Sequence, residues 1–146
     1  MQVEIKLDSN CQEVKVIVLT DRITEEVTEL VGKLSAETAQ RIPGFRENRG
    51  TLLDPAEIIR IYAGEGKVFA ETKDGVYALR QRLYELEERL SARMFVRISH
   101  SELINLNRVR GFDLSLAGTI CVTLTGGVST YVSRRYVSKI KQVLGL

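Results

Sequence analysis

The chain has 146 residues, 44% hydrophobic and 27% charged, with a formal net charge of +2. This is the composition of an ordinary folded domain and excludes a disordered protein. No apolar run approaches the ~20 residues of a membrane span, and residues 1–6 lack the basic and apolar regions of a signal peptide. Cys11 and Cys121 have neither disulfide nor metal spacing, and Cys121, inside an expected strand, is predicted to lie in the core. We therefore expect a soluble, cytoplasmic protein with free thiols.

The charge is distributed unevenly. From Ser91 onward the chain has eight Lys and Arg against two acids, Glu102 and Asp113, whereas the preceding ninety residues carry a net charge of −4. The first 45 residues alone hold five basic and eight acidic side chains. A basic C-terminal part indicates an anionic partner such as nucleic acid, and the acidic N-terminal part is a poor surface for one.

The first 45 residues predict a small strand–strand–helix segment. Residues 3–7 and 14–19 alternate or run apolar, as half-buried strands do. From Ile23 to Leu34 the apolar residues recur at helical spacing, and Thr24 or Asp21 can cap this helix. We expect this acidic segment to mediate dimerisation or regulation.

Residues 41–50 contain Pro43, Gly44, Asn48 and Gly50, which is the chemistry of a linker. Beyond this boundary, residues 46–146 predict a second domain that is α+β and mainly β. The expected helices are residues 79–90 and a C-terminal helix that is capped by the Ser133 side chain and ends at Gly145. The expected strands are residues 57–63, 67–72, 76–79, 95–98, 103–106, 112–116, 119–125 and 128–133.

Two adjacent arginines, Arg134 and Arg135, occupy the expected first turn of the C-terminal helix. The helix dipole disfavours cations there by roughly 0.3–1 kcal/mol each. Such a breach of a local rule indicates a site, because the backbone amides and guanidinium groups can together bind a phosphate or a guanine edge. The alternative is a solvated pair tolerated at small cost, and Lys139 and Lys141 add charge on the same helix.

The other polar candidates lie in loops. His100 lies between Ser99 and Ser101, where it can contact a base or phosphate or be a plain loop residue. The only acids in this part of the chain that could orient His100 in a catalytic triad are Glu102 and Asp113, and His100 has no second histidine or cysteine pair with which to bind a metal. We therefore expect neither an enzyme nor a cofactor. Lys67 follows a glycine-containing turn that does not have a phosphate-loop pattern, and Asn105 is expected to bond the backbone of a turn.

The C-terminal pattern resembles the LytTR DNA-binding domain family. The resemblance rests on Phe95–Ser101, Ile104–Leu106, a hairpin closed by Gly126–Gly127, and Val132–Tyr136 followed by a short lysine-bearing helix. It covers about residues 45–146. It implies an elongated domain of small β-sheets with short helices, and a bacterial transcription regulator whose loops enter successive major grooves of double-stranded DNA.

The resemblance also implies which residues contact DNA. Three loops would face the duplex: the hairpin tip before Lys67, the break at Ser99 and His100, and the helix start at Arg134 and Arg135, of which Arg135 matches the family's contacting arginine better. Lys139 adds phosphate-range charge.

Family members are often controlled by a phosphorylated receiver domain, which 45 residues are too short to form. The resemblance therefore implies a stand-alone regulator that binds repeated half-sites as a homodimer, with a membrane-bound inhibitor protein as a further partner and no small-molecule substrate. The alternative is a protein-interaction module that works through the acidic N-terminal helix.

Overall fold

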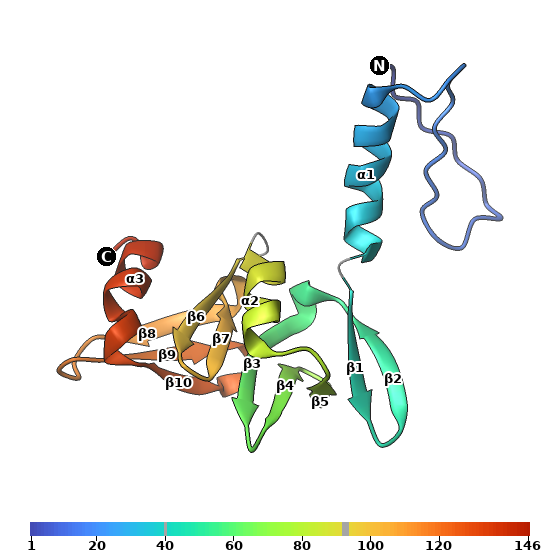
Figure 1. Cartoon of the computed structure of the whole chain (residues 1–146). Coiled ribbons are helices and arrows are strands. Elements are labelled where there is room, and N and C mark those ends of the chain that lie inside the picture. The colour runs from blue at the N-terminus through green and yellow to red at the C-terminus, as the bar shows by residue number, and fades with distance from the viewer. Residues whose placement is uncertain (40, 92–93) are drawn as a thin grey trace. The chain divides into compact units, whose positions relative to one another are not determined.

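The computed structural model describes residues 1–39, 41–91 and 94–146. The chain forms two compact units, Met1–Ala39 and Gln40–Leu146. Figure 1 shows both units, which are considered separately below. Within the described residues, every helix is too short or too polar to cross a lipid bilayer.

The first unit contains one helix, α1 (Glu25–Ala39). The Thr24 hydroxyl oxygen accepts a hydrogen bond from the Val27 amide at 3.3 Å, so Thr24 caps the helix as the sequence predicts. The predicted strands at residues 3–7 and 14–19 are not formed, and their large apolar side chains are exposed except for the half-buried Val18. The physical reason is that a two-stranded hairpin is marginal in water unless other elements cover its apolar face.

The second unit is built on a seven-stranded antiparallel sheet. Its strand order is β2-β1-β5-β4-β3-β7-β6, so that consecutive hairpins alternate with longer connections. The strands are β1 (Ile42–Arg46), β2 (Arg49–Leu53), β3 (Ile58–Gly64), β4 (Lys67–Thr72), β5 (Gly75–Leu79), β6 (Phe95–Ser99) and β7 (Glu102–Asn105).

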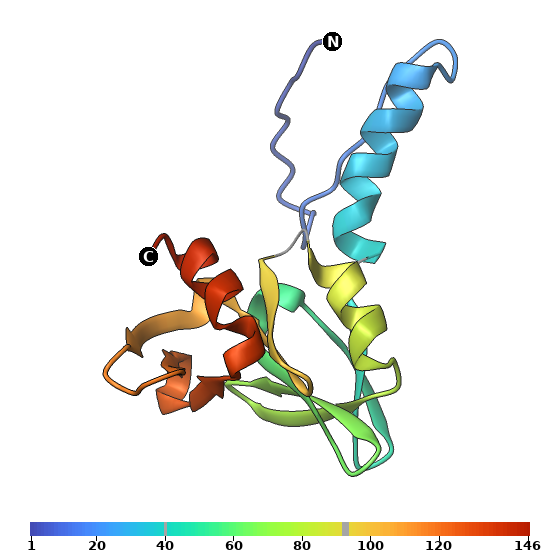
Figure 2. The same cartoon turned by 60° about the vertical axis from the view of Figure 1, so that its left-hand side comes forward.

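A three-stranded antiparallel sheet of order β10-β9-β8 completes the unit, together with two helices (Figure 2). Helix α2 packs on β3, β6 and β7, whereas α3 packs on β6 and β10 and thereby joins the two sheets. The elements are β8 (Val109–Asp113), β9 (Ile120–Leu124), β10 (Ser129–Val132), α2 (Leu83–Leu90), α3 (Arg134–Leu144) and the 3-10 turns η1 (Pro55–Glu57), η3 (Leu106–Arg108) and η4 (Thr125–Gly127).

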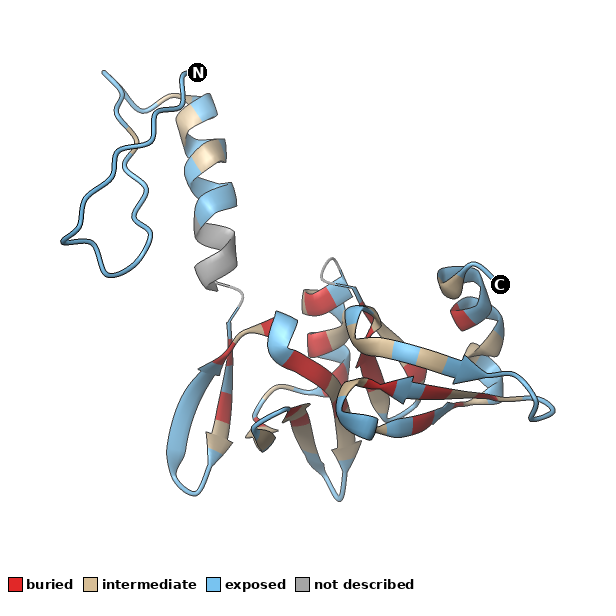
Figure 3. Cartoon of the chain, turned by 180° about the vertical axis from the view of Figure 1, so that it is seen from behind, coloured by how far each residue is buried: buried red, intermediate tan, exposed pale blue. Residues whose placement is uncertain are grey.

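The buried side chains form two hydrophobic clusters, visible as red segments in Figure 3. The first lies between the large sheet and α2, with Leu86, Leu90 and Ile61 among its fully buried members. The second links the small sheet to β6, β7 and α3, with Ile98 and Ile140 at 0% exposure. The predicted mainly β architecture is confirmed. Helix α3 packs on the small sheet and β6 because its apolar face completes the second cluster.

Asn105 has the structural role that the sequence predicts. The residue is buried, and its Nδ2 donates a hydrogen bond to the Ile58 carbonyl at 2.9 Å. Its Oδ1 accepts from the Asn107 amide at 3.0 Å and so caps η3. The side chain therefore ties the start of β3 to the end of β7.

Several local predictions need correction. Residues 41–50 are not a linker, because β1 pairs with both β2 and β5 and Ile42 is buried. The expected boundary at residue 45 falls inside β1. Strand β8 ends at Asp113, short of the expected residue 116, and Cys121 is half-buried instead of lying in the core. The connection between β9 and β10 has four residues, 125–128, instead of two, and its first three form η4.

Candidate nucleic-acid interface

Backbone hydrogen bonds bring the three predicted contact loops together. The Ala63 amide near the end of β3 donates to the Ser101 carbonyl at 2.8 Å, which joins the β3–β4 hairpin to the β6–β7 loop. The Ser133 amide at the start of α3 donates to the Ile98 carbonyl at 2.9 Å, which joins the start of the helix to β6 directly before the same loop. Residues that are more than thirty positions apart in sequence thus form one region, which we call the three-loop surface: residues 64–67, 99–101 and 133–135.

The first loop is a two-residue β-turn. Gly64 pairs with Lys67, and the two residues between them, Glu65 and Gly66, both have positive φ, at 53° and 76°. This turn type matches the right-handed twist of the flanking strands, so the hairpin forms a projecting tip, seen at the end of β3 and β4 in Figure 1. Lys67 is exposed beside this tip.

Arg97 supports the backbone of the second loop, because its Nη1 donates a hydrogen bond to the His100 carbonyl at 2.7 Å. The Nε of the same guanidinium contacts Glu87 Oε1 on α2 at 3.1 Å. The Ser99 hydroxyl oxygen accepts from the Ser101 amide at 3.2 Å, which leaves Ser99 half-buried in a turn. The His100 side chain is exposed, so this loop presents an imidazole on a braced backbone.

The third loop is the start of α3, where Arg134 and Arg135 are both exposed in the first turn. Ser133 has the N-cap conformation, but its side chain makes no capping hydrogen bond, so the predicted side-chain cap is wrong. Arg134 lies against the β8–β9 loop, where a Cβ built on Gly118 would be 3.1 Å from Arg134 Nε. Lys139 is exposed one turn after Arg135.

The strands that lead to the three loops carry a partly buried cluster that the sequence did not predict: Arg60, Glu71, Glu102 and Thr130. Arg60 Nε contacts Glu71 Oε2 at 2.6 Å, and Arg60 Nη1 lies 3.5 Å from Glu102 Oε2. The Thr130 hydroxyl donates to Glu102 Oε1 at 3.0 Å. The signal for this cluster was present, because Arg60 and Glu71 are charged residues inside otherwise apolar strands.

The protonation of this cluster is set by burial and by pairing. Burial raises the pKa of Glu102 above its ordinary value, and this effect outweighs the hydrogen bond from Thr130 and the charge of Arg60. For Arg60, burial lowers the pKa, but the two carboxylates together raise it above its ordinary value. The guanidinium is therefore a fixed charge of the cluster, and burial makes the Glu102 carboxylate easier to protonate than an exposed one.

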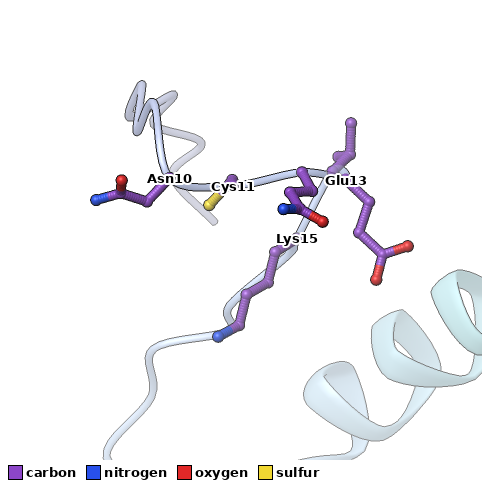
Figure 4. Close-up of a pocket in the computed structure, with 6 residues that line it drawn as sticks. Asn10, Cys11, Glu13 and Lys15 are labelled. Atoms are coloured by element: carbon purple, nitrogen blue, oxygen red, sulfur yellow. The ribbon is translucent and has the colours of Figure 1, made fainter.

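The two acids considered for a catalytic triad have other partners. Glu102 contacts Arg60 and Thr130, and Asp113 Oδ1 accepts from the Ser115 amide at 2.8 Å. The hydrogen bonds from Ser115 lower the pKa of Asp113. Elsewhere, residues 10–15 surround a shallow hollow in the first unit (Figure 4). Its lining is a run of consecutive exposed residues, which gives no convergent chemistry.

Comparisons with known proteins agree with this architecture. The profile of the LytTr DNA-binding domain family matches residues 48–145. The sensory transduction protein LytT of Enterococcus faecalis is 27% identical over 138 residues, which cover 92% of this chain and 57% of that protein. An uncharacterized HTH-type transcriptional regulator of Staphylococcus aureus is 25% identical over 147 residues, covering 100% of this chain and 99% of the relative.

One solved structure has the same fold. A LytTr DNA-binding domain from Bacillus cereus superposes with a TM-score of 0.69 at 18% identity, covering 73% of this chain and 97% of that domain.

Proposed function

The chain belongs to the LytTR DNA-binding domain family, and from this premise we propose that it is a sequence-specific transcription regulator that reads DNA through the three-loop surface. The observation that carries the proposal is the pair of backbone hydrogen bonds, from Ala63 to Ser101 and from Ser133 to Ile98, which gather the loops into one region. Lys67, Ser99, His100, Arg134, Arg135 and Lys139 are the proposed contacts.

Within this surface the residues have different tasks. Arg135 and His100 are exposed on braced backbones and read base edges, because a bidentate arginine distinguishes guanine by its O6 and N7 acceptors. Lys67 and Lys139 neutralise phosphates and position the domain on the duplex. The Arg134 side chain lies against the loop that contains Gly118. Because this contact limits its reach, its proposed partner is a phosphate and not a base edge. The amides in the first turn of α3 favour a phosphate at the same place.

The test is a binding titration on the DNA upstream of the chain's own operon, by fluorescence anisotropy at several salt concentrations. The double variant Arg134→Ala/Arg135→Ala is expected to bind more weakly and to show a salt slope that is shallower by about one to two. The control is Lys141→Ala on the last turn of α3, which we expect to leave the preference for this DNA intact. Unchanged affinity and salt slope in the double variant would show that the proposed surface is wrong.

The first unit is proposed to join two copies on repeated half-sites. It exposes large apolar side chains, including Val3, Ile5 and Leu7 at 81–93%, more than a monomeric protein usually leaves uncovered. Antiparallel pairing of residues 3–7 of two copies about Ile5 would place Glu4 opposite the partner's Lys6, which is a charge-complementary, two-fold arrangement. The exposed apolar side chains of residues 14–19 of both copies would supply the cover that a two-stranded pair needs. We therefore propose that a second copy of the chain covers these exposed apolar residues.

Sedimentation equilibrium of the full chain tests this pairing. The chain is expected to be a dimer, and Ile5→Asp is expected to be a monomer that still binds a single half-site. Gln12→Asp, which adds the same charge at an exposed polar position, serves as the control and should remain dimeric. A monomeric unsubstituted chain at the concentrations that saturate DNA would contradict the proposal.

Control of the regulator is proposed to be independent of phosphorylation. The described residues before Gln40 contain one helix, whereas a receiver needs a complete α/β domain. A membrane-bound inhibitor protein is the proposed control, with α1 as its docking element. Glu25 and Glu26 in the first turn of α1 and the exposed Val31 also fit a second candidate function, a protein-interaction module. Retention on heparin at low salt separates the two, because only the DNA-binding protein should be retained.

A further inference from the structure

The cluster of Arg60, Glu71, Glu102 and Thr130 connects the two sheets behind the three-loop surface. Glu102 begins β7 directly after the second loop, and Thr130 lies on β10, three residues before Ser133 in the third loop. The hydrogen bond from the Thr130 hydroxyl to Glu102 Oε1, at 3.0 Å, therefore links the strands that carry these two loops.

The same cluster reaches the first loop through β3 and β4. Arg60 holds Glu71 on β4 at 2.6 Å, and its guanidinium lies over the Tyr62 ring at 4.8 Å from the centroid. The Tyr62 ring in turn contacts Phe69, with centroids 5.5 Å apart, and Phe69 is two residues beyond Lys67. Polar and aromatic contacts thus connect β3, β4, β7 and β10, which are the strands that lead to the three loops.

Glu102 has an unusual environment for a carboxylate. Its side chain is only 12% exposed, and Oε2 is buried without a hydrogen-bond donor, 3.5 Å from Arg60 Nη1. A buried carboxylate with incomplete pairing does little for stability compared with an apolar residue of the same size. Because stability does not explain this carboxylate, and because it joins strands that lead to the loops, a role in positioning the loops is the better explanation.

We propose that Glu102 is a positioning residue that, through Arg60 and Thr130, fixes the three loops relative to one another so that they fit successive sites on one duplex. The inference deepens the proposed function and rests on it for its DNA consequence. The structural part stands alone, because loop placement can be measured without DNA.

Two variants test the bridge with little change of shape. Glu102→Gln keeps the size of the side chain and removes its charge, whereas Thr130→Val keeps the size and removes the donor hydroxyl. The matched controls are Glu88→Gln and Thr123→Val, the same substitutions at exposed positions of the same unit. Thr130→Val changes no charge, so it separates positioning from a general electrostatic effect on DNA binding.

The first readout is amide hydrogen exchange of the DNA-free protein. Both variants are expected to accelerate exchange of the Ala63 and Ser133 amides by about tenfold or more, because these amides close the hydrogen bonds between the loops. The amides of α2 are the internal reference and should keep their rates. Unchanged exchange at Ala63 and Ser133, or an equal acceleration throughout the unit, would overturn the proposal.

The second readout is the ratio of affinities for a duplex selected from a random-sequence pool and for an unselected duplex. Thr130→Val is expected to lower this ratio by about tenfold with little change in binding to unselected DNA, and the double variant should be no worse than the more severe single variant. Additive losses, or an unchanged ratio in both variants, would overturn the proposal. If the unsubstituted chain prefers no duplex while loop exchange changes as expected, the proposed function fails and the positioning role stands.

Discussion

Replacing Arg135 with alanine should change stability and DNA binding in opposite directions. Arg135 is exposed in the first turn of α3, and its side chain makes no hydrogen bond or ion pair with any other residue that the structure describes. Removing a cation from this end of the helix relieves an unfavourable dipole interaction of roughly 0.3–1 kcal/mol. The Arg135→Ala chain should therefore unfold at an equal or slightly higher urea concentration.

The same substitution removes the proposed base contact, which is worth about 1–3 kcal/mol of discrimination. Affinity for the selected duplex should accordingly fall by roughly 5- to 150-fold, as measured by fluorescence anisotropy, while affinity for an unselected duplex falls less. Lys141→Ala is the mirror control: at the last turn it should cost about 0.3–1 kcal/mol of stability and spare the preference. Equal losses on both duplexes would refute base reading by Arg135 and leave only a phosphate contact.

Three further predictions concern the unit that carries the loops. Asn105→Ala should lower the free energy of unfolding by about 2–4 kcal/mol in urea titrations, because it removes the bond to the Ile58 carbonyl and the cap of η3; Asn107→Ala, at an exposed position, should change it far less. The raised pKa of Glu102 means that the folded state binds its proton more tightly than the unfolded state. As pH rises from about 4.5 through the raised pKa, the unsubstituted chain should therefore lose stability relative to Glu102→Gln, and a pH-independent difference would contradict this. Gly44→Ala should cost about 1–3 kcal/mol, seen as a lower urea midpoint, since the added Cβ would lie 2.7 Å from a Leu53 methyl carbon.

The sequence predicts the second unit well because its strands are short, amphipathic and separated by turn residues. The β3–β4 hairpin is a clear case, because Gly64 and Gly66 lie between two apolar runs and local chemistry alone specifies such a turn. Asn105 was also predictable, since an amide among apolar neighbours needs backbone partners.

The wrong predictions of strands and of a linker have a common physical cause: whether a segment forms a β-strand depends on pairing partners elsewhere in the chain. Residues 3–7 have the pattern of a strand but find no covering element within their own unit, whereas residues 42–46 have linker chemistry but find β2 and β5. The contact between Thr130 and Glu102 joins residues that periodicity cannot relate, because it depends on how two sheets face each other.

The hydrogen bond from Ser133 to Ile98 has a consequence for biosynthesis. Residues 133–135 of the three-loop surface come after residues 99–101 in the chain, and the Ser133 amide is the donor for the Ile98 carbonyl directly before the second loop. A nascent chain in which Ser133 has not yet left the ribosome therefore lacks this bond, however much of the large sheet has already folded. If the three-loop surface contacts DNA as proposed, a product that terminates before Ser133 lacks part of that contact and does not compete for the promoter.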